Sequence, residues 1–415
     1  MRNLFLMLLG LVVLSFSGVV SAEQWPRFRG ANGDGQSDAA GIPTQWQESD
    51  YLWKKSLPGV GRSSPVIWDN QLIVTSADPD SAEQVILAFD ARSGAQLWEK
   101  RIAASPYHKH AMNSFATSTP AIDAKRIYLS WMDGENIMLV ALTHQGDEIW
   151  RRQVGTLVEQ HGFGTSPVVI DDVICVDNDT EDAEHSVVTG VNAATGEVLW
   201  HVPRGSGKTV FATPCVWETA GGKKLLLTAS MGSGLTAFDP ANGQVAWQAL
   251  QQDLPDRCVS SPIVAGGLVF ASCGSGNNGL VLIAMRPGKD GEPPQEAYRL
   301  DSGVPNIPTP LVAGDLLFLW HDRGTVTCID LATHEEYWHR RVGGRFHSSP
   351  VRVGDRIYCV SLDGEVVVLA ADKEYKLLAR NKLDEPVQAT PAVANSHIYF
   401  RTDSSLICLG QTAEN

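Results

Sequence analysis

The sequence predicts an all-β protein, an eight-bladed β-propeller of four-stranded antiparallel blades. A signature of two mostly small residues followed by proline occurs eight times, at spacings of 40 to 55 residues, the period of a four-stranded blade. Each copy is followed by short apolar runs between turn residues, the pattern of antiparallel meanders. The last copy lacks a fourth strand, and a candidate for that strand lies near the N-terminus.

The signature itself marks the start of each blade. Its eight prolines are Pro65, Pro120, Pro167, Pro214, Pro262, Pro310, Pro350 and Pro391. In the first unit a short strand follows the proline over 66–68, and Asp69-Asn70 forms a turn. Strands at 72–74 and 85–89 come next, and a fourth strand ends near residue 98. No long segment has the 3.6-residue period of a helix.

A turn followed by an aromatic residue ends most units. In Ala88 to Trp98 an Asp opens the turn, where its side chain accepts backbone N–H bonds, and a Gly closes the turn in the left-handed conformation. The aromatic ring on the outer strand is expected to pack on the neighbouring blade. The predicted blade-docking residues are Trp53, Trp98, Trp150, Trp200, Trp247, Tyr298 and Trp338, and unit seven carries Leu378 instead.

This Ala-x-Asp-x-x-(Ser/Thr/Asn)-Gly-x-x-x-Trp unit resembles the repeat of the pyrroloquinoline quinone (PQQ) enzymes. The resemblance covers about residues 50 to 410, and non-enzymatic relatives in that family include the outer-membrane assembly lipoprotein BamB. It implies a propeller fold. It leaves open whether the chain is a quinoprotein enzyme or a binding protein, because a propeller does not itself imply a chemistry.

Ring closure and the domain boundaries follow from the incomplete last unit. Tyr51 to Lys55 is a strand with a suitably placed Trp, and we expect it to complete the last blade and so remove an exposed sheet edge. The expected division is a signal peptide at 1–22, an extended arm at 23–49 packed on the propeller surface, the propeller at 50–411, and a short tail at 412–415.

Residues 1–22 have the features of a signal peptide. Arg2 precedes an apolar stretch from Leu4 to Val20, and small residues end at Ala22, where we expect cleavage. No Cys follows the apolar stretch, so we expect a periplasmic or secreted protein that is not a lipoprotein. An uncleaved anchor is the alternative, although the stretch is short for a membrane span.

Charge and cysteine content restrict the partners. The chain has a formal net charge of −14 at pH 7, and an acidic protein repels nucleic acid phosphates and anionic lipids. We therefore expect no nucleic-acid partner. Seven cysteines leave at least one unpaired. Most lie in apolar strand patterns and are interpreted as core residues, while Cys258 and Cys273 flank one hairpin and are the best disulfide candidates.

The candidate binding site is the loop-rich face around the channel, because function concentrates on long loops. The residues just before each Pro signature should rim the channel and are rich in cations. One interpretation is a pocket for an anionic ligand, and the other is surface charge that pairs with acidic loops such as 179–184. The residues are Arg62, His161, Phe163, Lys208, Phe211, Arg257, Asn306, Arg345, Phe346 and His347.

Metal binding is a weaker hypothesis. His108 and His110, with His161 and His185, would have to converge to bind a metal. Residues 32–35 (Asn-Gly-Asp-Gly) share part of a calcium-loop pattern but lack its full ligand spacing and closing Glu. We therefore predict no metal site and no catalytic residue.

Two functions remain open. The first is a non-catalytic binding scaffold of the bacterial cell envelope, which presents its loop-rich face to a protein or peptide, with outer-membrane protein assembly as one candidate process. The second is a PQQ-dependent dehydrogenase with an unusual site, which would need PQQ and calcium. The resemblance implies adjacent cysteines, an acidic base and calcium ligands for such an enzyme. No two Cys are adjacent and the rim set contains no Asp or Glu, so the scaffold without a cofactor is preferred.

Overall fold

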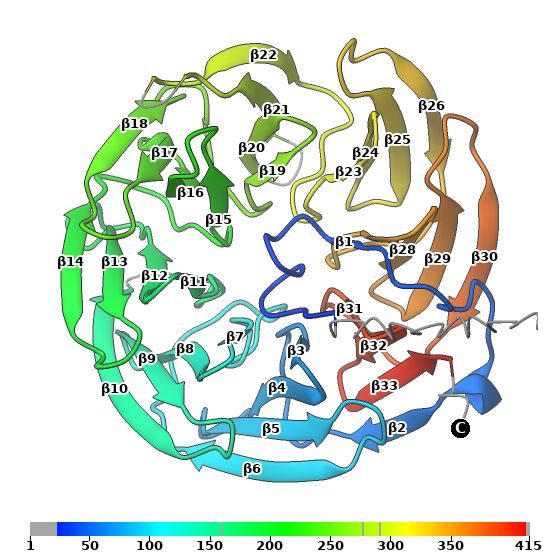
Figure 1. Cartoon of the computed structure of the whole chain (residues 1–415), viewed down its shortest axis with the longest axis horizontal. Helices are drawn as coiled ribbons and strands as arrows, with labels where there is room; N and C mark the ends of the chain where they lie inside the picture. The colour runs from blue at the N-terminus through cyan, green and yellow to red at the C-terminus, as the bar shows by residue number, and fades with distance from the viewer. Residues whose placement is uncertain (1–22, 158–159, 276–277, 290–291, 412–415) are drawn as a thin grey trace, which may run out of the picture.

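The protein is a ring of eight β-sheets around a central axis (Figure 1). The computed structural model describes residues 23–157, 160–275, 278–289 and 292–411. The predicted signal peptide and the tail at 412–415 lie outside the described residues. The described part confirms the predicted fold class, because every blade contains four antiparallel strands that follow one another along the chain, apart from the strand that closes the last blade.

The first four blades follow the predicted order from the channel outward. Their strands are, in blade 1, β3 (Val66–Trp68), β4 (Gln71–Ala77), β5 (Gln84–Asp90) and β6 (Gln96–Ile102); in blade 2, β7 (Ala121–Ile122), β8 (Ile127–Asp133), β9 (Asn136–Leu142) and β10 (Glu148–Thr156); in blade 3, β11 (Val168–Ile170), β12 (Val173–Asn178), β13 (Val187–Asn192) and β14 (Val198–Pro203); in blade 4, β15 (Cys215–Glu218), β16 (Lys224–Ser230), β17 (Gly234–Phe238) and β18 (Val245–Ala249).

The remaining blades repeat the plan, with N-terminal strands added to the last two. Their strands are, in blade 5, β19 (Ile263–Ala265), β20 (Leu268–Ser275), β21 (Asn278–Arg286) and β22 (Gln295–Leu300); in blade 6, β23 (Leu311–Ala313), β24 (Leu316–Trp320), β25 (Thr325–Asp330) and β26 (Glu336–Arg341); in blade 7, β1 (Gln36–Ser37), β27 (Val351–Val353), β28 (Arg356–Val360), β29 (Glu365–Ala370) and β30 (Leu377–Lys382); in blade 8, β31 (Ala392–Ala394), β32 (His397–Arg401), β33 (Ser405–Gly410) and β2 (Trp53–Ser56). A short 3-10 helix, η1 (Glu48–Asp50), precedes β2.

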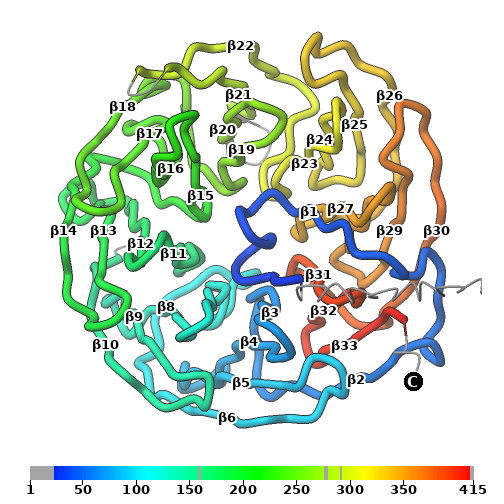
Figure 2. The backbone as a smooth tube through the Cα atoms, viewed as in Figure 1, coloured from blue at the N-terminus to red at the C-terminus, as the bar shows by residue number. Residues whose placement is uncertain are grey.

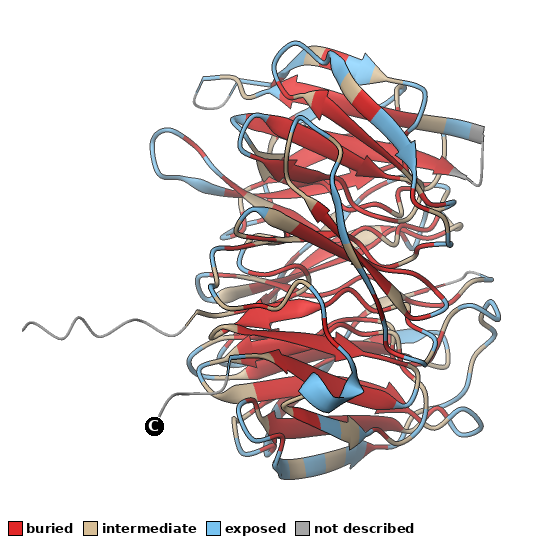
Figure 3. Cartoon of the chain, turned by 90° about the vertical axis from the view of Figure 1, so that its right-hand side faces the viewer, coloured by how far each residue is buried: buried red, intermediate tan, exposed pale blue. Residues whose placement is uncertain are grey.

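The core lies between the blades and not inside one central layer. The two middle strands of a blade are buried on both faces, as in β5, whose residues are buried except the last. The outer strand β6 is mostly exposed or half-buried. Figure 3 shows the same gradient, with buried residues filling the disc and exposed residues on outer strands and loops. Sheets packed face to face in a ring bury apolar side chains from both neighbours.

The N-terminal strand closes the ring as predicted. Strand β2 pairs antiparallel with β33, and Trp53 lies opposite Cys408. In Figure 2 this strand lies beside the C-terminal strands at the outer edge of blade 8. The first and last parts of the chain therefore share one blade, and β33 has no free edge.

Tryptophans on the outer strands dock each blade on the next. The indole N–H of Trp53, Trp98, Trp150, Trp200 or Trp338 donates to a backbone carbonyl in the β-turn of the following blade, at 2.8 to 3.2 Å. A Cβ on Gly94 would lie 2.6 Å from the Trp53 ring, and one on Gly196 would lie 2.6 Å from the Trp150 ring. Both glycines also have positive φ, so the turn needs Gly for conformation and for close approach.

Blades 4 and 5 dock without that hydrogen bond. Trp247 is buried, but its indole N–H has no partner among the described residues. It packs edge-on against Trp217 at 5.7 Å between ring centroids. Tyr298 takes the tryptophan position of blade 5 and lies 5.2 Å from the His334 ring. Both side chains are buried where predicted.

Blade 7 corrects one detail of the sequence analysis. The residue at its tryptophan position is Ala379, which lies opposite Val368, while the predicted Leu378 is 41% exposed. The paired residues Val368 and Ala379 are one position further apart in sequence than Ala88 and Trp98 of blade 1, so the tryptophan position moves from Leu378 to Ala379. The space over Ala379 is filled by Trp46 of the arm, whose ring lies 6.5 Å from that of Tyr358 in the same blade.

The N-terminal arm also differs from the prediction. It does not lie only on the surface, because Trp25 is 1% exposed and Arg29 is 0% exposed. Its first part enters the channel and crosses the ring from blade 1 to blade 7 (Figure 1). It bridges Ile67 of β3 and adds β1 parallel to β27. The innermost strand of each blade has one edge whose backbone N–H and C=O groups are not paired within the sheet. The arm forms hydrogen bonds with these groups at β3 and β27.

Among the residues that the structure describes, none of the helices has the length and apolarity of a membrane span.

Replacing Trp53 by Ala tests the closure. The ring is 7% exposed and packs on Tyr399 at 5.9 Å, so the substitution leaves a cavity where the last blade meets the first. We expect the free energy of unfolding, measured by urea titration, to fall by about 3–5 kcal/mol. The matched control is Leu97→Ala on the same kind of outer strand, which removes a side chain 51% exposed and should cost less than about 0.5 kcal/mol. Equal effects of the two substitutions would contradict docking through Trp53.

Candidate functional site

The candidate site is a cavity of about 380 Å³ at the centre of the ring. Its innermost wall is a ring of eight hydroxyl side chains, one from each blade, each directly before a signature proline. Six of the backbone N–H groups at these positions donate to the hydroxyl of the next blade, at 2.9 to 3.2 Å. We call this ring the hydroxyl belt, and it consists of Ser64, Thr119, Ser166, Thr213, Ser261, Thr309, Ser349 and Thr390.

The residues two positions earlier in each unit form a second ring of the wall. They differ in chemistry from blade to blade, unlike the belt, and include a cation, an imidazole, an amide, a glycine and apolar groups. We call them the variable ring: Arg62, Thr117, Gly164, Phe211, Val259, Ile307, His347 and Gln388. The belt joins the blades and has the same chemistry in every unit. The variable ring therefore supplies the side chains that differ between units and that a ligand in the cavity would contact.

Loops above these rings and the arm below them complete the cavity. The outer tier consists of His110, Met112, Asn113, His161, Arg257, Gly274 and Asn306, and Phe28 of the arm lies on the other side. The long loop between β6 and β7 is held over the mouth, since the backbone N–H of His110 donates to the His161 carbonyl at 3.2 Å. Because the arm occupies the opposite end, the channel forms a pocket with its mouth on the loop-rich face.

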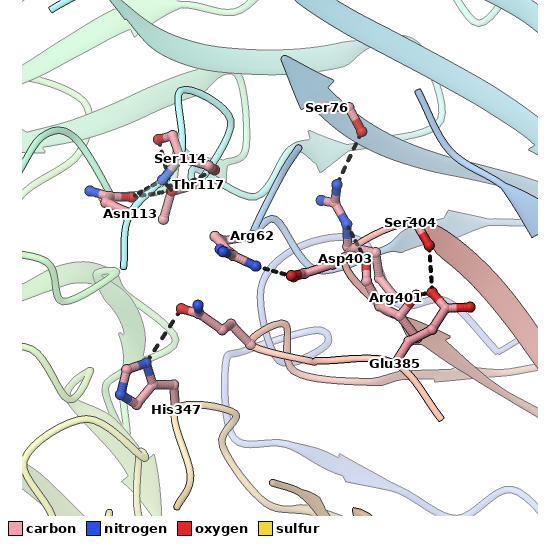
Figure 4. A network of polar contacts seen from close by, with 12 residues as sticks. Arg62, Ser76, Asn113, Ser114, Thr117, His347, Glu385, Arg401, Asp403 and Ser404 are labelled. Atoms are coloured by element: carbon pink, nitrogen blue, oxygen red, sulfur yellow. Dashed lines mark hydrogen bonds and ion pairs between the residues drawn. The ribbon is translucent and has the colours of Figure 1, made fainter. Parts of the chain in front are cut away.

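One polar cluster lies where blades 7, 8 and 1 meet (Figure 4). Arg62 forms an ion pair with Asp403, which belongs to the turn after β32. The Gln388 amide lies between Arg62, the Met112 carbonyl and His347. Burial lowers the pKa of His347 below its usual value, which favours the neutral imidazole. The cluster therefore holds one fixed guanidinium beside a neutral ring.

A second cluster lies across the cavity at blades 2, 3 and 5. Arg257 forms an ion pair with Glu181, and its Nη1 lies 3.3 Å from Nε2 of His161. The His161 ring stacks on His110 at 5.6 Å and meets Phe211 edge-on at 6.4 Å. Glu181 lies in the acidic 179–184 loop, so the charge pairing expected from the sequence occurs here. The two arginines thus occupy opposite sides of the pocket.

The structure brings six of the ten predicted rim residues to the cavity wall, namely Arg62, His161, Phe211, Arg257, Asn306 and His347. The other four are corrections. Phe163 and Phe346 are 4% and 0% exposed and pack in the core, the latter 5.3 Å from the Trp320 ring. Lys208 is half-buried and Arg345 exposed, and neither lines the cavity. Side chains alternate in direction along an extended segment, so neighbours of wall residues point away from the channel.

Sequence reasoning missed most of the wall. The belt was visible as the hydroxyl before each proline, but its place on the axis was not inferred. Thr117, Val259, Ile307 and Gln388 occupy the same position as Arg62 in other units but were not among the predicted rim residues. Phe28, His110, Met112 and Asn113 come from the arm and a long loop, which repeat alignment does not place.

The metal hypotheses find no support in the donor geometry. Among the residues that the structure describes, no group of three or more His, Cys, Asp or Glu side chains is placed to hold a metal ion. His185 pairs with Asp182 at 2.9 Å. A Cβ on Gly33 or Gly35 would lie 2.7 or 2.6 Å from the guanidinium of Arg27 or Arg29, so the 32–35 segment is a turn that covers two arginines.

A quinone cofactor held with calcium does not fit this wall. Calcium takes six to eight oxygen ligands, usually with carboxylates among them. No Asp or Glu side chain among the described residues lines the cavity. The seven cysteines are free and buried, although the thiols of Cys258 and Cys273 interact with each other. We therefore derive no step through a quinone.

A buried charge cluster lies beside the pocket, between blades 3 and 4. Asp177, Asp179 and Arg204 are 1%, 1% and 8% exposed. Arg204 lies 3.4 Å from Asp179, and neither carboxyl oxygen of Asp177 has a hydrogen-bond partner among the described residues. Burial, together with the Asp179 carboxyl, raises the pKa of Asp177 well above its usual range. One guanidinium does not compensate two buried carboxylates.

These features define a PQQ-like β-propeller whose channel is closed at one end. Comparison with known families places it further. The family model described as "Outer membrane protein assembly factor BamB" matches residues 47–156, 82–340 and 294–377. The chain therefore belongs to this family, as the repeat motif predicted.

Individual relatives are distant. The outer membrane protein assembly factor BamB of Yersinia pestis is 25% identical over 227 residues, which cover 52% of this chain and 54% of the relative. The chain thus matches about half the length of that curated relative. The crystal structure of BamB from Moraxella catarrhalis has a TM-score of 0.62 at 15% identity, covering 88% of this chain and 98% of that one. A quinohemoprotein alcohol dehydrogenase from Comamonas testosteroni has a TM-score of 0.65 at 13% identity, covering 94% and 82%. Similarity at these identities shows the fold alone.

The substitution Asp177→Asn tests the buried cluster. A raised pKa means that the native state holds the proton more tightly than the unfolded state, so stability falls as pH rises from about 4 through the native pKa. Asn has the same shape and does not titrate. We expect the variant to be more stable than wild type at pH 8, by about 1.4 kcal/mol for each unit of the pKa increase, and the difference to shrink toward pH 4. Urea titrations across this range measure it.

The control for this experiment is Asp182→Asn. Asp182 is exposed, and hydrogen bonds from Glu184 and His185 lower the pKa of its carboxyl, so its replacement should not stabilise the protein at pH 8. If Asp177→Asn instead destabilises the protein at pH 8, Asp177 is ionised there and Arg204 depends on it.

Proposed function

We propose that this protein is a non-catalytic binding scaffold of the bacterial cell envelope. It acts in the periplasm or outside the cell after cleavage near Ala22, and it presents the loop-rich face of the propeller to a protein or peptide partner. The process in which we place it is outer-membrane protein assembly, because the family bears that description. Lipid attachment is not part of this proposal.

The observation that carries the proposal is the difference between the two faces of the ring. On one face the first and second strands of each blade are joined by short turns, and the arm fills the axis. The other face carries the long β6–β7 loop, which is ordered by contacts with blade 3: Asn113 donates to the His161 carbonyl at 2.8 Å. Met112 is exposed there despite being apolar. An ordered loop with an exposed apolar residue is typical of a binding surface.

The alternative is a PQQ-dependent dehydrogenase, favoured by the shared fold with the quinohemoprotein alcohol dehydrogenase. The carboxylate-free wall argues against it. Mixing the purified protein with the quinone and calcium distinguishes the two functions. A saturable absorbance change together with dye reduction by an alcohol supports the enzyme. No change of either kind supports the scaffold.

Site-specific photo-crosslinking tests the scaffold. A benzophenone amino acid replaces Ala111, which is exposed in the β6–β7 loop, or Ala124, which is exposed in the turn between β7 and β8 on the opposite face. Both positions flank blade 2, so the pair is matched. We expect irradiation of intact cells to give covalent adducts from position 111 only, and mass spectrometry to identify an outer-membrane assembly component or a precursor protein in them.

Adducts of equal yield from both positions would contradict binding through the loop-rich face. An absence of adducts from position 111, at normal protein levels, would contradict a stable partner. An adduct that contains only proteins unrelated to outer-membrane assembly would overturn the proposed process and leave the binding face.

A further inference from the structure

Three arginines around the pocket are buried without a direct ion pair, and the carboxylates of Asp34 and Asp403 act on them only from a longer distance. Arg27, Arg29 and Arg401 are 5%, 0% and 1% exposed, and none of them forms an ion pair within the described part of the chain. Arg401 donates to the Thr75 carbonyl at 2.9 Å and to the Ser76 hydroxyl at 3.0 Å. Burial lowers the pKa of Arg401 to about 9 and those of Arg27 and Arg29 to about 10. All three remain charged at neutral pH.

Each guanidinium lies directly behind the cavity wall. Arg29 donates to the carbonyl of Thr309 at 3.1 Å, and Thr309 is a belt residue. Arg27 donates to the carbonyl of Pro214 at 3.1 Å, one residue after the belt residue Thr213. Its Nε and Nη1 have no partner among the described residues. Phe28, which separates the two arginines in sequence, faces the cavity itself.

Arg401 lies behind the opposite part of the wall. It donates to the carbonyl and hydroxyl of Ser63 at 3.4 and 3.2 Å, and Ser63 precedes the belt residue Ser64. Buried charges without a direct ion pair are costly, and this cost is repeated three times around one cavity. A negative charge inside the cavity would offset it, and the low dielectric behind the wall would strengthen the attraction.

The wall itself offers donors. Hydroxyls of the belt accept backbone N–H bonds from the preceding blade, as Thr119 does from Ser64 at 3.0 Å. An oxygen engaged in this way keeps its own O–H for donation, and the accepted bond polarises it as a donor. Arg62 and Arg257 add guanidinium donors on opposite sides. Their partners Asp403 and Glu181 do not line the cavity, so the described part of the surface that a ligand meets is donor-rich and has no carboxylate.

We propose that the pocket binds a small organic anion, a carboxylate joined to an apolar or aromatic group. The carboxylate accepts hydrogen bonds from the belt and from Arg62 or Arg257. The apolar part packs on the apolar wall residues, which are Phe28, Met112, Phe211, Val259 and Ile307. The volume of about 380 Å³ falls in the range of small-molecule sites, about 300–1,000 Å³. A cation is disfavoured because no Asp or Glu side chain of the described residues lines the wall.

This proposal goes beyond the scaffold function and does not depend on a protein partner. It also differs from quinone binding, because no metal is needed. Inorganic phosphate shares the oxyanion chemistry but lacks the apolar group, so it serves to separate charge from shape in the test.

Isothermal titration calorimetry with the protein of residues 23–415 tests the proposal. The probes are benzoate, phenylacetate, benzamide, phenylacetamide and inorganic phosphate, each with EDTA or with added calcium. We expect at least one carboxylate to bind one per chain with a Kd below about 1 mM, a modest affinity for so few atoms. Its neutral amide, which has nearly the same shape, should bind at least tenfold more weakly, and phosphate should also bind more weakly. Calcium should have no effect.

Variants locate the binding. Arg257→Gln and Arg62→Gln should each raise the Kd at least tenfold, whereas Arg101→Gln should leave it unchanged, because Arg101 is an ion-paired residue on the outer strand β6. Circular dichroism and the unfolding midpoint check that each variant is folded. The amide comparison in the wild-type protein does not depend on any variant.

The proposal is overturned if neither carboxylate binds saturably, if the amides bind as well as the acids, or if binding requires calcium. Weakening by Arg101→Gln equal to that by Arg257→Gln would place the anion outside the pocket and would also overturn it. If the Arg257→Gln variant no longer binds the anion but still gives the same crosslinks from position 111, the anion site and the partner-binding face are independent of each other.

Discussion

A ring of blades closes only if every blade packs on the next, and two N–H···O contacts recur at most of these junctions. On the inside, the backbone N–H just before six of the eight signature prolines donates to the hydroxyl of the next blade. On the outside, an indole N–H donates to a turn carbonyl of the next blade. A single such bond contributes only about 1 kcal/mol, but leaving its buried donor unpaired costs more. The inner contact therefore requires Ser or Thr at one position in every unit.

This requirement separates structure from specificity along the chain. The residue before a proline is held in extended conformation, so the belt position and the position two residues earlier both face the axis. The first joins blades and always carries a hydroxyl, as in Ser64. The second, as in Arg62, makes no contact that the blades share, and it is a different residue type in each of the eight units. Residues at the second position can therefore be substituted, and the ligand site altered, without breaking the contacts that close the ring.

The sequence predicted what repetition encodes. Eight copies of one unit determined the number of blades, the order of strands and the closure by Trp53, because each depends on a contact made many times. The site was predicted less well. Six rim residues reached the wall, but Phe163 and Phe346 point into the core, because their orientation depends on a one-residue register that spacing alone does not give. The roles of Phe28 and Trp46 were missed because the arm occurs once and its contacts lie about 300 residues away in sequence, as between Trp46 and Asn381.

The arm turns a repeat protein into an asymmetric one. It leads directly into β2, the outer strand of blade 8, it places Trp46 where blade 7 lacks a tryptophan, and it carries Arg27, Phe28 and Arg29 into the axis. Without the third contribution the ring would enclose a channel open at both ends, whose wall charges would be hydrated and screened. With it, two guanidinium groups are held in a water-excluded layer beneath a ring of hydroxyl donors. The segment that completes the fold is thus also the segment that gives the pocket its floor and much of its positive potential, so stability and ligand selectivity in this protein depend on the same residues.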